Sequence, residues 1–472
     1  MTGMNENPAA LLPEVLLATA AVLGLLLGSW LPRHRQWTVG LLAAAACAGG
    51  IAAAAIAAPG APASAFGEAF AIDPVTSAAR ITVLGGCLLV LALSGGALRA
   101  HPRESEFYVL LQLATLGTLM MAGAQDLLLL AAGYLLASVP GYALAGFRKD
   151  TPGTEAALEY YFVGALFGVL MLTGATVLYA AGRGTGYPVL STGLPRAPVV
   201  LVTAGLVALL GGVLFKAGAV PGHFWVPDAV QGSSAPVAAF LTTVPKISAL
   251  AAAYRLGELL FSRTDAPWAP LIAVLAAASM TLGNLAAFFQ RDVKRLLAYS
   301  VISQVGYLLM PAAMAGRSGI AQQALLFYLA GYALTNLGAF AVVRALPGAT
   351  DIEDYRGLVR RRPALAVSLA VCLLGLVETP PTAVFLGKLE AFSAAVDGGY
   401  AWLAVVATVN TVASLFYYLR WIAPAVSGRP QEPLSRVSNR PSTVAYAAAA
   451  ASVVLGVVGG PLLAVLDGPL AR

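Results

Sequence analysis

Three lysines lie inside long apolar stretches of the sequence, at Lys216, Lys246 and Lys388. The other basic residues are mostly arginines, and nearly all of them lie between such stretches. Arginine stays protonated under almost any condition, whereas a buried lysine can release its proton. The three lysines are therefore the residues that a proton path through an apolar protein would use. The alternative is that each one reaches a water interface or forms a static ion pair.

Two of these lysines flank expected breaks in a helix. Lys216 precedes Pro221 in LFKAGAVPGHFWVPDA, and Lys388 follows Pro380 and Pro381 in GLVETPPTAVFLGKLEAF. Proline removes a backbone donor and interrupts the hydrogen-bond ladder. Unpaired backbone at membrane depth is tolerated only where it is buried in protein or lines a wet cavity. The breaks therefore predict ion sites. About two turns of helix separate Pro381 from Lys388, so the amine can lie against the carbonyls that the break frees.

Three further titratable residues lie close to these stretches. His223 follows the first break, where a neutral imidazole can pass a proton along a wire; the alternative is a loop histidine bound by backbone. Glu378 lies two residues before the double proline and pairs with Lys388 only if the break folds it back. Glu159 opens the sixth apolar stretch, where it could equally favour a helix N-terminus. The predicted proton path consists of Lys216, Lys246, Lys388, His223, Glu159 and Glu378.

The elements that must position these residues are membrane helices. Of 472 residues, 59% are hydrophobic and 11% are charged, whereas a soluble domain carries roughly 25% charged residues. This composition excludes a folded nucleotide-binding or peripheral catalytic domain. We attribute the net charge of +6 to basic residues in loops that set the membrane topology, and not to affinity for nucleic acid. The N-terminus has no basic cluster, so residues 11–31 are predicted as a retained span and not a cleaved signal.

The apolar runs predict an all-α, polytopic membrane protein of about fourteen helices. They are expected at residues 11–31, 37–58, 77–98, 106–123, 125–147, 158–182, 197–219, 234–261, 268–289, 294–315, 318–346, 364–393, 400–424 and 442–466. The broken helices are the seventh and twelfth, so equivalent helices run in opposite directions, as in transporters built from inverted repeats. We predict N-terminal helices over 1–105, inverted five-helix repeats over 106–262 and 263–425, and a C-terminal loop and helix over 426–472.

Basic residues alternate between the loops. The loops after even-numbered helices hold only four arginines, and the loops after odd-numbered helices hold most of the others. Positive charge stays on the cytoplasmic side of a membrane. Both termini are therefore expected outside.

Cysteine and histidine provide no metal or redox centre. Cys47, Cys87 and Cys372 are far apart in apolar runs, and the three histidines are equally scattered. A haem or iron–sulfur centre needs clustered ligands. We therefore expect no metal and no cofactor in this chain, and we interpret the cysteines as small buried hydrophobes.

Three segments together resemble a known family. They are FKAGAVPGHFWVPDAVQGSSAPVAAFLTTVPK, NLAAFFQRDVKRLLAYSVISQVGYLL and DIEDYRGLVRRRPALAVSLAVCLLGLVETPPTAVFLGKLEAF. Each is similar to the N-type, antiporter-like membrane subunit of bacterial proton-pumping NADH:quinone oxidoreductase, respiratory complex I. The resemblance implies a fourteen-helix inverted-repeat fold that moves protons while partner subunits oxidise NADH and reduce quinone. It also implies neighbouring antiporter-like subunits and a place in the bacterial cell (inner) membrane. By resemblance, family motif positions fall on Lys216, Lys246, Lys388, His223, Tyr299 and Ser300.

The sequence departs from this family at two positions. The family carries a glutamate on helix five where this sequence has Leu135, and a lysine opening helix six where it has Glu159. We predict that Glu159 substitutes for the missing acid and interacts with Lys216; the alternative is an impaired first half-channel. Two other functions stay open. One is a subunit of a multi-subunit sodium/proton antiporter or membrane-bound hydrogenase, and the other is a helical scaffold with degenerate transport residues.

Overall fold

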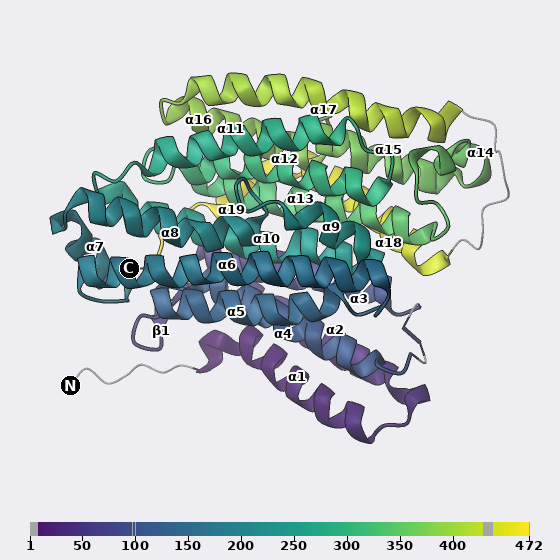
Figure 1. Ribbon diagram of the computed structural model, residues 1–472, viewed down its shortest axis with the longest axis horizontal. Helices are drawn as coiled ribbons and strands as arrows, with labels where there is room; N and C mark the ends of the chain where they lie inside the picture. Colours follow the sequence, from purple (N-terminus) through teal and green to yellow (C-terminus); the bar gives the residue numbers. More distant parts are fainter. Residues whose placement is uncertain (1–7, 97, 100, 428–437, 472) are drawn as a thin grey trace.

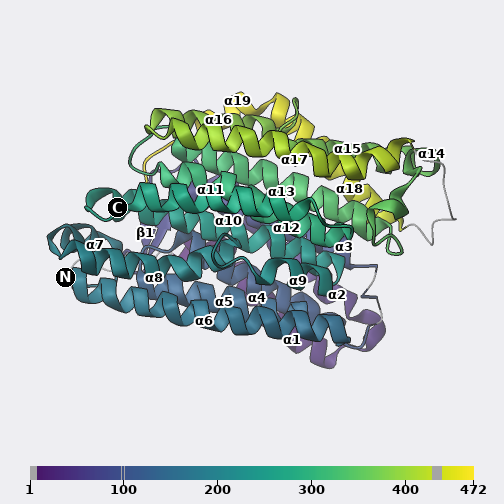
Figure 2. The same ribbon diagram turned by 45° about the horizontal axis from the view of Figure 1, so that its top comes forward.

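The computed structural model describes residues 8–96, 98–99, 101–427 and 438–471. In these ranges long helices lie alongside one another, with one short β-hairpin at an end of the bundle (Figures 1 and 2). The elements are α1 (Leu12–Trp30), α2 (Trp37–Ala57), β1 (Ala63–Ala65), β2 (Phe70–Ile72), α3 (Pro74–Ser94), α4 (Glu104–Gly123), α5 (Leu127–Ala145), α6 (Thr151–Gly182), α7 (Tyr187–Gly193), α8 (Val199–Ala217), α9 (Trp225–Gly232), α10 (Ala235–Leu259), α11 (Trp268–Ala287), α12 (Val293–Ala313), α13 (Ala321–Ala345), α14 (Leu358–Arg361), α15 (Pro363–Val377), α16 (Ala383–Asp397), α17 (Ala401–Ser427), α18 (Asn439–Val457) and α19 (Gly459–Leu466).

All fourteen predicted spans fall on helices of the structure. Among the described residues, twelve helices are long and apolar enough to cross a membrane, and the pair α18 and α19, bent by 78°, supplies one more. The remaining span is the pair α15 and α16, which is broken at the double proline as predicted. The seventh span is broken as well, between α8 and α9. The sequence analysis missed the bend before α19, the short helices α7 and α14, and the hairpin.

Helix α6 begins at Thr151, seven residues before its predicted start. Asp150 caps this helix by accepting a hydrogen bond from the Gly153 N–H at 3.0 Å. Pro152 fits the first turn, where its missing N–H costs no intrahelical bond. Glu159 therefore lies two turns inside α6, and the prediction that it opens this helix is wrong.

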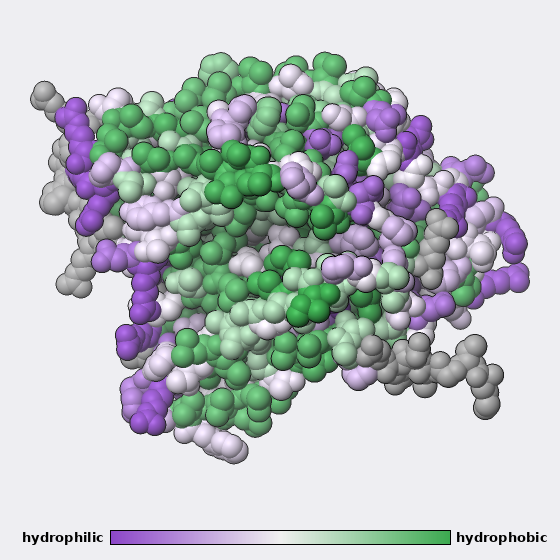
Figure 3. All heavy atoms as spheres, turned by 180° about the vertical axis from the view of Figure 1, so that it is seen from behind, coloured by the Kyte–Doolittle hydropathy of each residue, from purple (hydrophilic) through white to green (hydrophobic). Residues whose placement is uncertain are grey.

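Helix α10 is the centre of the bundle. The most apolar part of it is entirely buried, and it packs against α3, α4, α8, α12 and α13. By contrast, α1, α6 and α17 expose leucine, valine and aromatic side chains to the outside. Seen from behind, the surface of the molecule has a broad apolar zone between two more polar ends (Figure 3). This distribution suits a bilayer, because lipid accepts apolar side chains and satisfies no backbone polar groups.

The two ends of the bundle carry different loops. The loops after α1, α3, α5 and α13 lie at one end, whereas the hairpin, α7 and residues 467–471 lie at the other (Figure 1). Helix α1 also begins at this second end. The end that holds the loops after odd-numbered spans is the end rich in arginine, so the alternation of charge in the sequence corresponds to two faces of the molecule.

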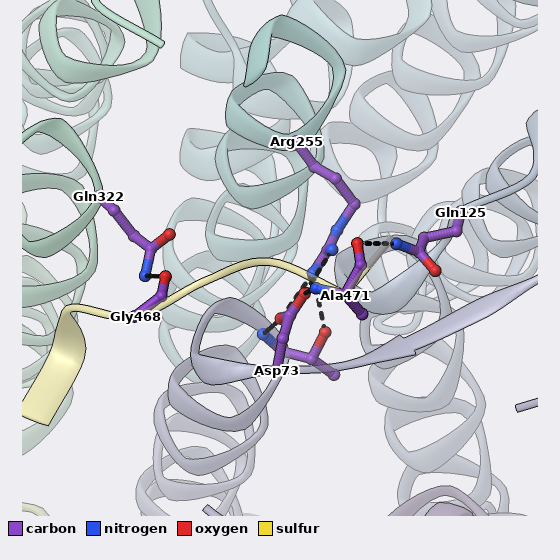
Figure 4. A network of polar contacts seen from close by, with 7 residues as sticks. Asp73, Gln125, Arg255, Gln322, Gly468 and Ala471 are labelled. Carbon is purple, nitrogen blue, oxygen red and sulfur yellow. Dashed lines mark hydrogen bonds and ion pairs between the residues drawn. The ribbon is translucent and has the colours of Figure 1, made fainter. Parts of the chain in front are cut away.

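A buried ion pair stabilises the end of the bundle that holds the hairpin. Arg255 of α10 contacts Asp73 at 2.6 Å, and both side chains are fully buried. Asp73 also caps α3 by accepting a hydrogen bond from the Thr76 N–H at 3.0 Å. The Ala471 N–H donates to the same carboxylate at 3.1 Å, and Gln125 donates to the Ala471 carbonyl at 2.6 Å (Figure 4). One carboxylate thus ties α3, α10 and residues 467–471 together.

Candidate functional site

The first helix break binds the ammonium of Lys246. Helix α8 ends at Ala217, and Gly218 turns the chain with φ +75°. A helix leaves its last carbonyls without an intrahelical donor, and Lys246 Nζ donates to the Ala217 carbonyl at 2.5 Å. Lys246 is fully buried, with its Nζ 5.5 Å from the centre of the Trp225 ring. A Cβ on Gly218 would lie 2.4 Å from this Nζ, so the ammonium occupies the space that glycine leaves.

Lys216, the penultimate residue of α8, has a different partner. It is fully buried, and its Nζ donates to Ser138 Oγ of α5 at 2.8 Å. The Tyr134 ring centre lies 5.7 Å from the same nitrogen. Within the described ranges, no carboxylate forms an ion pair with Lys216. The ammonium is therefore held by a neutral hydroxyl in an aromatic surrounding.

The predicted pair between Glu159 and Lys216 is not formed in this structure. Glu159 is only half-buried, and its charged neighbours are Asp228, Glu155 and Arg295. A carboxylate at position 135 would not pair with Lys216 either, because Leu135 is 47% exposed on the outer face of α5. One turn later on the same helix, Ser138 faces inward and takes the lysine. The sequence analysis missed Ser138, since a serine in an apolar helix is ordinary and most often bonds its own backbone.

The second break binds the ammonium of Lys388. Helix α15 ends at Val377, and the chain resumes as α16 at Ala383. Lys388 Nζ donates to the carbonyls of Leu376 and Val377 at 3.1 and 3.4 Å. The structure thus confirms that the amine lies against carbonyls freed by the break. Lys388 is fully buried, and the centre of the Tyr307 ring lies 3.9 Å from Nζ.

Glu378 and His223 lie at the two breaks without contacting the lysines directly. Glu378 has φ +110° and interacts electrostatically with Lys388, yet no ion pair joins them among the described residues. His223 lies between α8 and α9, and its ring is 4.3 Å from that of Phe224. Its Nδ1 is buried, and the backbone of Pro221 interacts with the ring through a hydrogen bond. The alternative of a loop histidine bound by backbone therefore fits this position.

Buried polar side chains fill the space between the two breaks. Lys388 shares the Leu376 carbonyl with Gln304, whose Nε2 donates to it at 2.8 Å. Tyr328 donates to Gln304 Oε1 at 2.6 Å. One turn further along α13, Tyr332 donates to the carbonyl of Thr242 at 2.7 Å. Thr242 lies one turn before Lys246 on α10, so polar contacts lead from the second break most of the way to the first.

Another polar cluster leads from Lys388 toward α17. Tyr307, whose ring covers the ammonium, receives a hydrogen bond from Thr411 at 3.2 Å. Nearby, Tyr417 donates to Asn284 at 3.0 Å, and Asn284 donates to Asn410 at 3.0 Å. The sequence analysis identified none of these residues, because single tyrosines and asparagines in apolar helices carry no spacing signal.

No group of three or more His, Cys, Asp or Glu side chains in the described ranges could hold a metal ion. The three cysteines are free and buried. The titratable groups that the two breaks share are the amines of the three lysines, and the hydroxyl and carbonyls around them accept their hydrogen bonds.

Comparisons with known proteins agree with this geometry. The family model described as NADH:quinone oxidoreductase/Mrp antiporter, TM matches residues 124–414, which include both breaks and all three lysines. Over 460 residues the chain is 52% identical to NADH-quinone oxidoreductase subunit N of Mycobacterium sp. (strain JLS), with 97% of each chain covered. The chain belongs to the NADH-quinone oxidoreductase subunit N family. The resemblance drawn from three sequence segments is thus confirmed.

Other proteins are also similar to this member of the subunit N family. Subunit N 1 of Streptomyces griseus subsp. griseus is 52% identical over 464 residues, with 98% of each chain covered. A chain of respiratory complex I from Thermus thermophilus has a TM-score of 0.84 at 34% identity, covering 96% of this chain and 99% of that one. The Mrp complex from Dietzia sp. DQ12-45-1b also has a TM-score of 0.84, covering 96% of each chain, but at 21% identity it shares only the fold. The subunit N assignment therefore rests on the closer sequences.

Proposed function

We propose that this chain translocates protons across the membrane through Lys216, Lys246 and Lys388, as subunit N of NADH:quinone oxidoreductase. Partner subunits oxidise NADH and reduce quinone, and neighbouring antiporter-like subunits lie beside this one. The chain resides in the bacterial cell membrane with its arginine-rich loops in the cytoplasm and both termini outside, because positive loops stay on the side of synthesis. No electron passes through the chain itself.

The observation that carries this proposal is that, in the described ranges, none of the three ammoniums forms an ion pair with a carboxylate. Each fully buried lysine binds only a hydroxyl or carbonyls at hydrogen-bond distance. An ammonium in a low-dielectric site is costly unless an opposite charge compensates it. A lysine held in this way releases and regains a proton more readily than one locked in a salt bridge. A static ion pair, the alternative reading of the sequence, has no partner here.

The polar contacts support an order for the path. Lys216 and Lys246 interact electrostatically at the first break, and the side chains of α13 lead from Thr242 to Gln304 at the second. Lys388 then ends the path at α16. Glu159 and Glu378 lie at the margins of this row, Glu159 near Asp228 and Glu378 near Lys388. His223 lies in the turn next to the first break and passes protons to it.

The test replaces Lys246 in the assembled complex. Lys246 is the twelfth residue of α10, about 18 Å along the helix and so near the middle of a hydrocarbon layer roughly 30 Å thick. Lys246→Met should lower the number of protons moved per NADH oxidised without preventing assembly. Lys246→Arg should not restore it fully, because guanidinium does not release its proton.

The matched control is Lys149→Met, which removes the same charge from an exposed loop lysine. Proton uptake and NADH oxidation are measured together in proteoliposomes. The control should behave as the unmodified complex does. Unchanged proton movement by an assembled Lys246→Met complex would remove this lysine from the path.

A further inference from the structure

We propose that this chain binds a phosphate group in a cavity at the beginning of α10. The cavity measures about 540 Å³ and lies between the last residues of α3, α5 and α13 and the first residues of α10 and α12. This is the end of the bundle with the arginine-rich loops. Four described side chains that line it are basic, and none of the described lining residues is acidic: His101, Arg148, Lys294 and Arg344. The cavity therefore favours an anion.

Arg344 is the first observation that points to a ligand. It lies in the last turn of α13, half-buried, and forms neither an ion pair nor a hydrogen bond within the described ranges. A guanidinium carries five donors in a fixed plane and matches the oxygens of a phosphate two at a time. The neighbouring cations are already engaged. Arg148 pairs with Asp150, and Lys294 donates to the carbonyls of Gln231 and Ser233.

The N-terminus of α10 is the second observation. This helix is 25 residues long, and Ser234 precedes it without forming a side-chain cap. The first N–H groups of a helix have no intrahelical acceptor, and together with the helix dipole they attract anions. Pro236 has no N–H to contribute, so Ala235 and Val237 supply the donors of the first turn.

Ser233 is an independent third observation. This residue is fully buried, lines the cavity, and has no described hydrogen-bond partner for its Oγ. A buried hydroxyl without a partner is unfavourable, and a ligand oxygen in the cavity would supply the missing bond. The hydroxyl, the first turn of α10 and the Arg344 guanidinium thus line one space from different elements.

The size and lining of the cavity define the chemical class. Phosphate presents several oxygens that can accept from donors on different sides, which a carboxylate or a halide cannot do as fully. Apolar residues also line the cavity, among them Leu98, Phe147 and Val343. These can accommodate the glycerol or acyl part of a phospholipid, but they do not exclude free phosphate from the cytoplasm. The shared ligand is therefore a phosphate group, from either source.

The test compares the complex carrying Arg344→Gln with the unmodified complex and with Arg360→Gln. Arg360 is exposed on the short helix α14, which follows α13, so its replacement removes the same charge from the same end of the molecule. Each complex is washed in phosphate-free detergent buffer. One arm measures phospholipid phosphorus in the organic extract, and the other measures binding of radiolabelled inorganic phosphate by equilibrium dialysis.

We expect the complex with Arg344→Gln to lose about one phospholipid per chain, or to bind inorganic phosphate at least about tenfold more weakly. This is the change in affinity expected from the loss of one charged hydrogen bond. The arm that changes identifies the source. Arg360→Gln should match the unmodified complex in both arms. Ser233→Asp places a carboxylate at the cavity and should reduce phosphate binding in the same arm as Arg344→Gln does. This variant also tests the proposal if the complex with Arg344→Gln does not assemble. Equal phosphorus content and equal phosphate affinity in all four complexes would overturn the proposal.

Discussion

Replacing Ser138 with alanine tests whether a hydroxyl has taken over the role of the missing acid on α5. Ser138 Oγ is the described hydrogen-bond acceptor of Lys216 Nζ, at 2.8 Å, and is itself 1% exposed. A hydrogen bond to a charged group contributes about 1.5–3 kcal/mol. Ser138→Ala should therefore destabilise the protonated lysine by that amount. A proton step that passes through this lysine should slow roughly tenfold or more.

The assay is the ratio of protons moved to NADH oxidised, measured in proteoliposomes that contain the assembled complex. Ser138→Ala should lower this ratio while leaving NADH oxidation by the partner subunits detectable. Ser393→Ala is the matched control, because Ser393 is exposed on α16 and its described side-chain hydrogen bond goes to the Leu389 carbonyl of its own helix. The control should keep the full ratio.

A second variant distinguishes the hydroxyl from the position of the family's acid. Leu135→Glu should not rescue Ser138→Ala, because Leu135 is 47% exposed on the outer face of α5 while Ser138 faces inward. Full rescue, or an unchanged ratio in Ser138→Ala itself, would refute the assignment. The first half-channel would then depend on a group other than this hydroxyl.

Four more variants, used in three experiments, probe the breaks and the buried ion pair. Gly218→Ala should reduce proton movement, because its Cβ would lie 2.4 Å from Lys246 Nζ and its φ of +75° costs an L-residue about 1–2 kcal/mol; a normal ratio would show that the ammonium can shift freely. Lys388→Ala should reduce proton movement more than Glu378→Gln does, since the Lys388 side chain donates to two freed carbonyls and a carboxylate cannot donate to them; the reverse order would make the carboxylate the main site. Arg255→Met should lower the stability of the chain by about 3–5 kcal/mol, because it leaves a buried carboxylate unpaired, and an unchanged thermal unfolding temperature would contradict this.

The sequence predicted the lysines and both breaks because each depends on a local signal. A lysine in an apolar run and a proline in a helix stand out residue by residue, so Lys216, Lys246 and Lys388 needed no knowledge of tertiary contacts. The start of α6 was missed although Asp150 and Pro152 form a helix-start signal. Apolar periodicity was given more weight than the cap, and this error placed Glu159 at the wrong depth.

The partners of the lysines could not be predicted in the same way. Ser138 is 78 residues from Lys216 in the sequence, and Tyr328 is 24 residues from Gln304. Their contacts depend on how the helices rotate against one another, which composition does not define. The same limit explains the wrong expectation for Lys216, because a search among acids on neighbouring helices passes over a neutral hydroxyl.

Both breaks place an ammonium at the carbonyl end of an interrupted helix, although they do so differently. At the first, Lys246 reaches from α10 to the end of α8, and at the second, Lys388 reaches back from α16 to the end of α15. The C-terminus of a helix carries partial negative charge, so a protonated lysine stabilises each end and a neutral amine does so less. Loss of the proton therefore loosens the bond that holds the break, and the charge of each lysine is coupled to the local backbone. Arginine at either position would keep the charge in place permanently, and methionine would never supply it. Both substitutions should impair proton movement, but for opposite reasons. A measurement of the thermal stability of each variant would distinguish them, because arginine should preserve the contact at the break and methionine should weaken it.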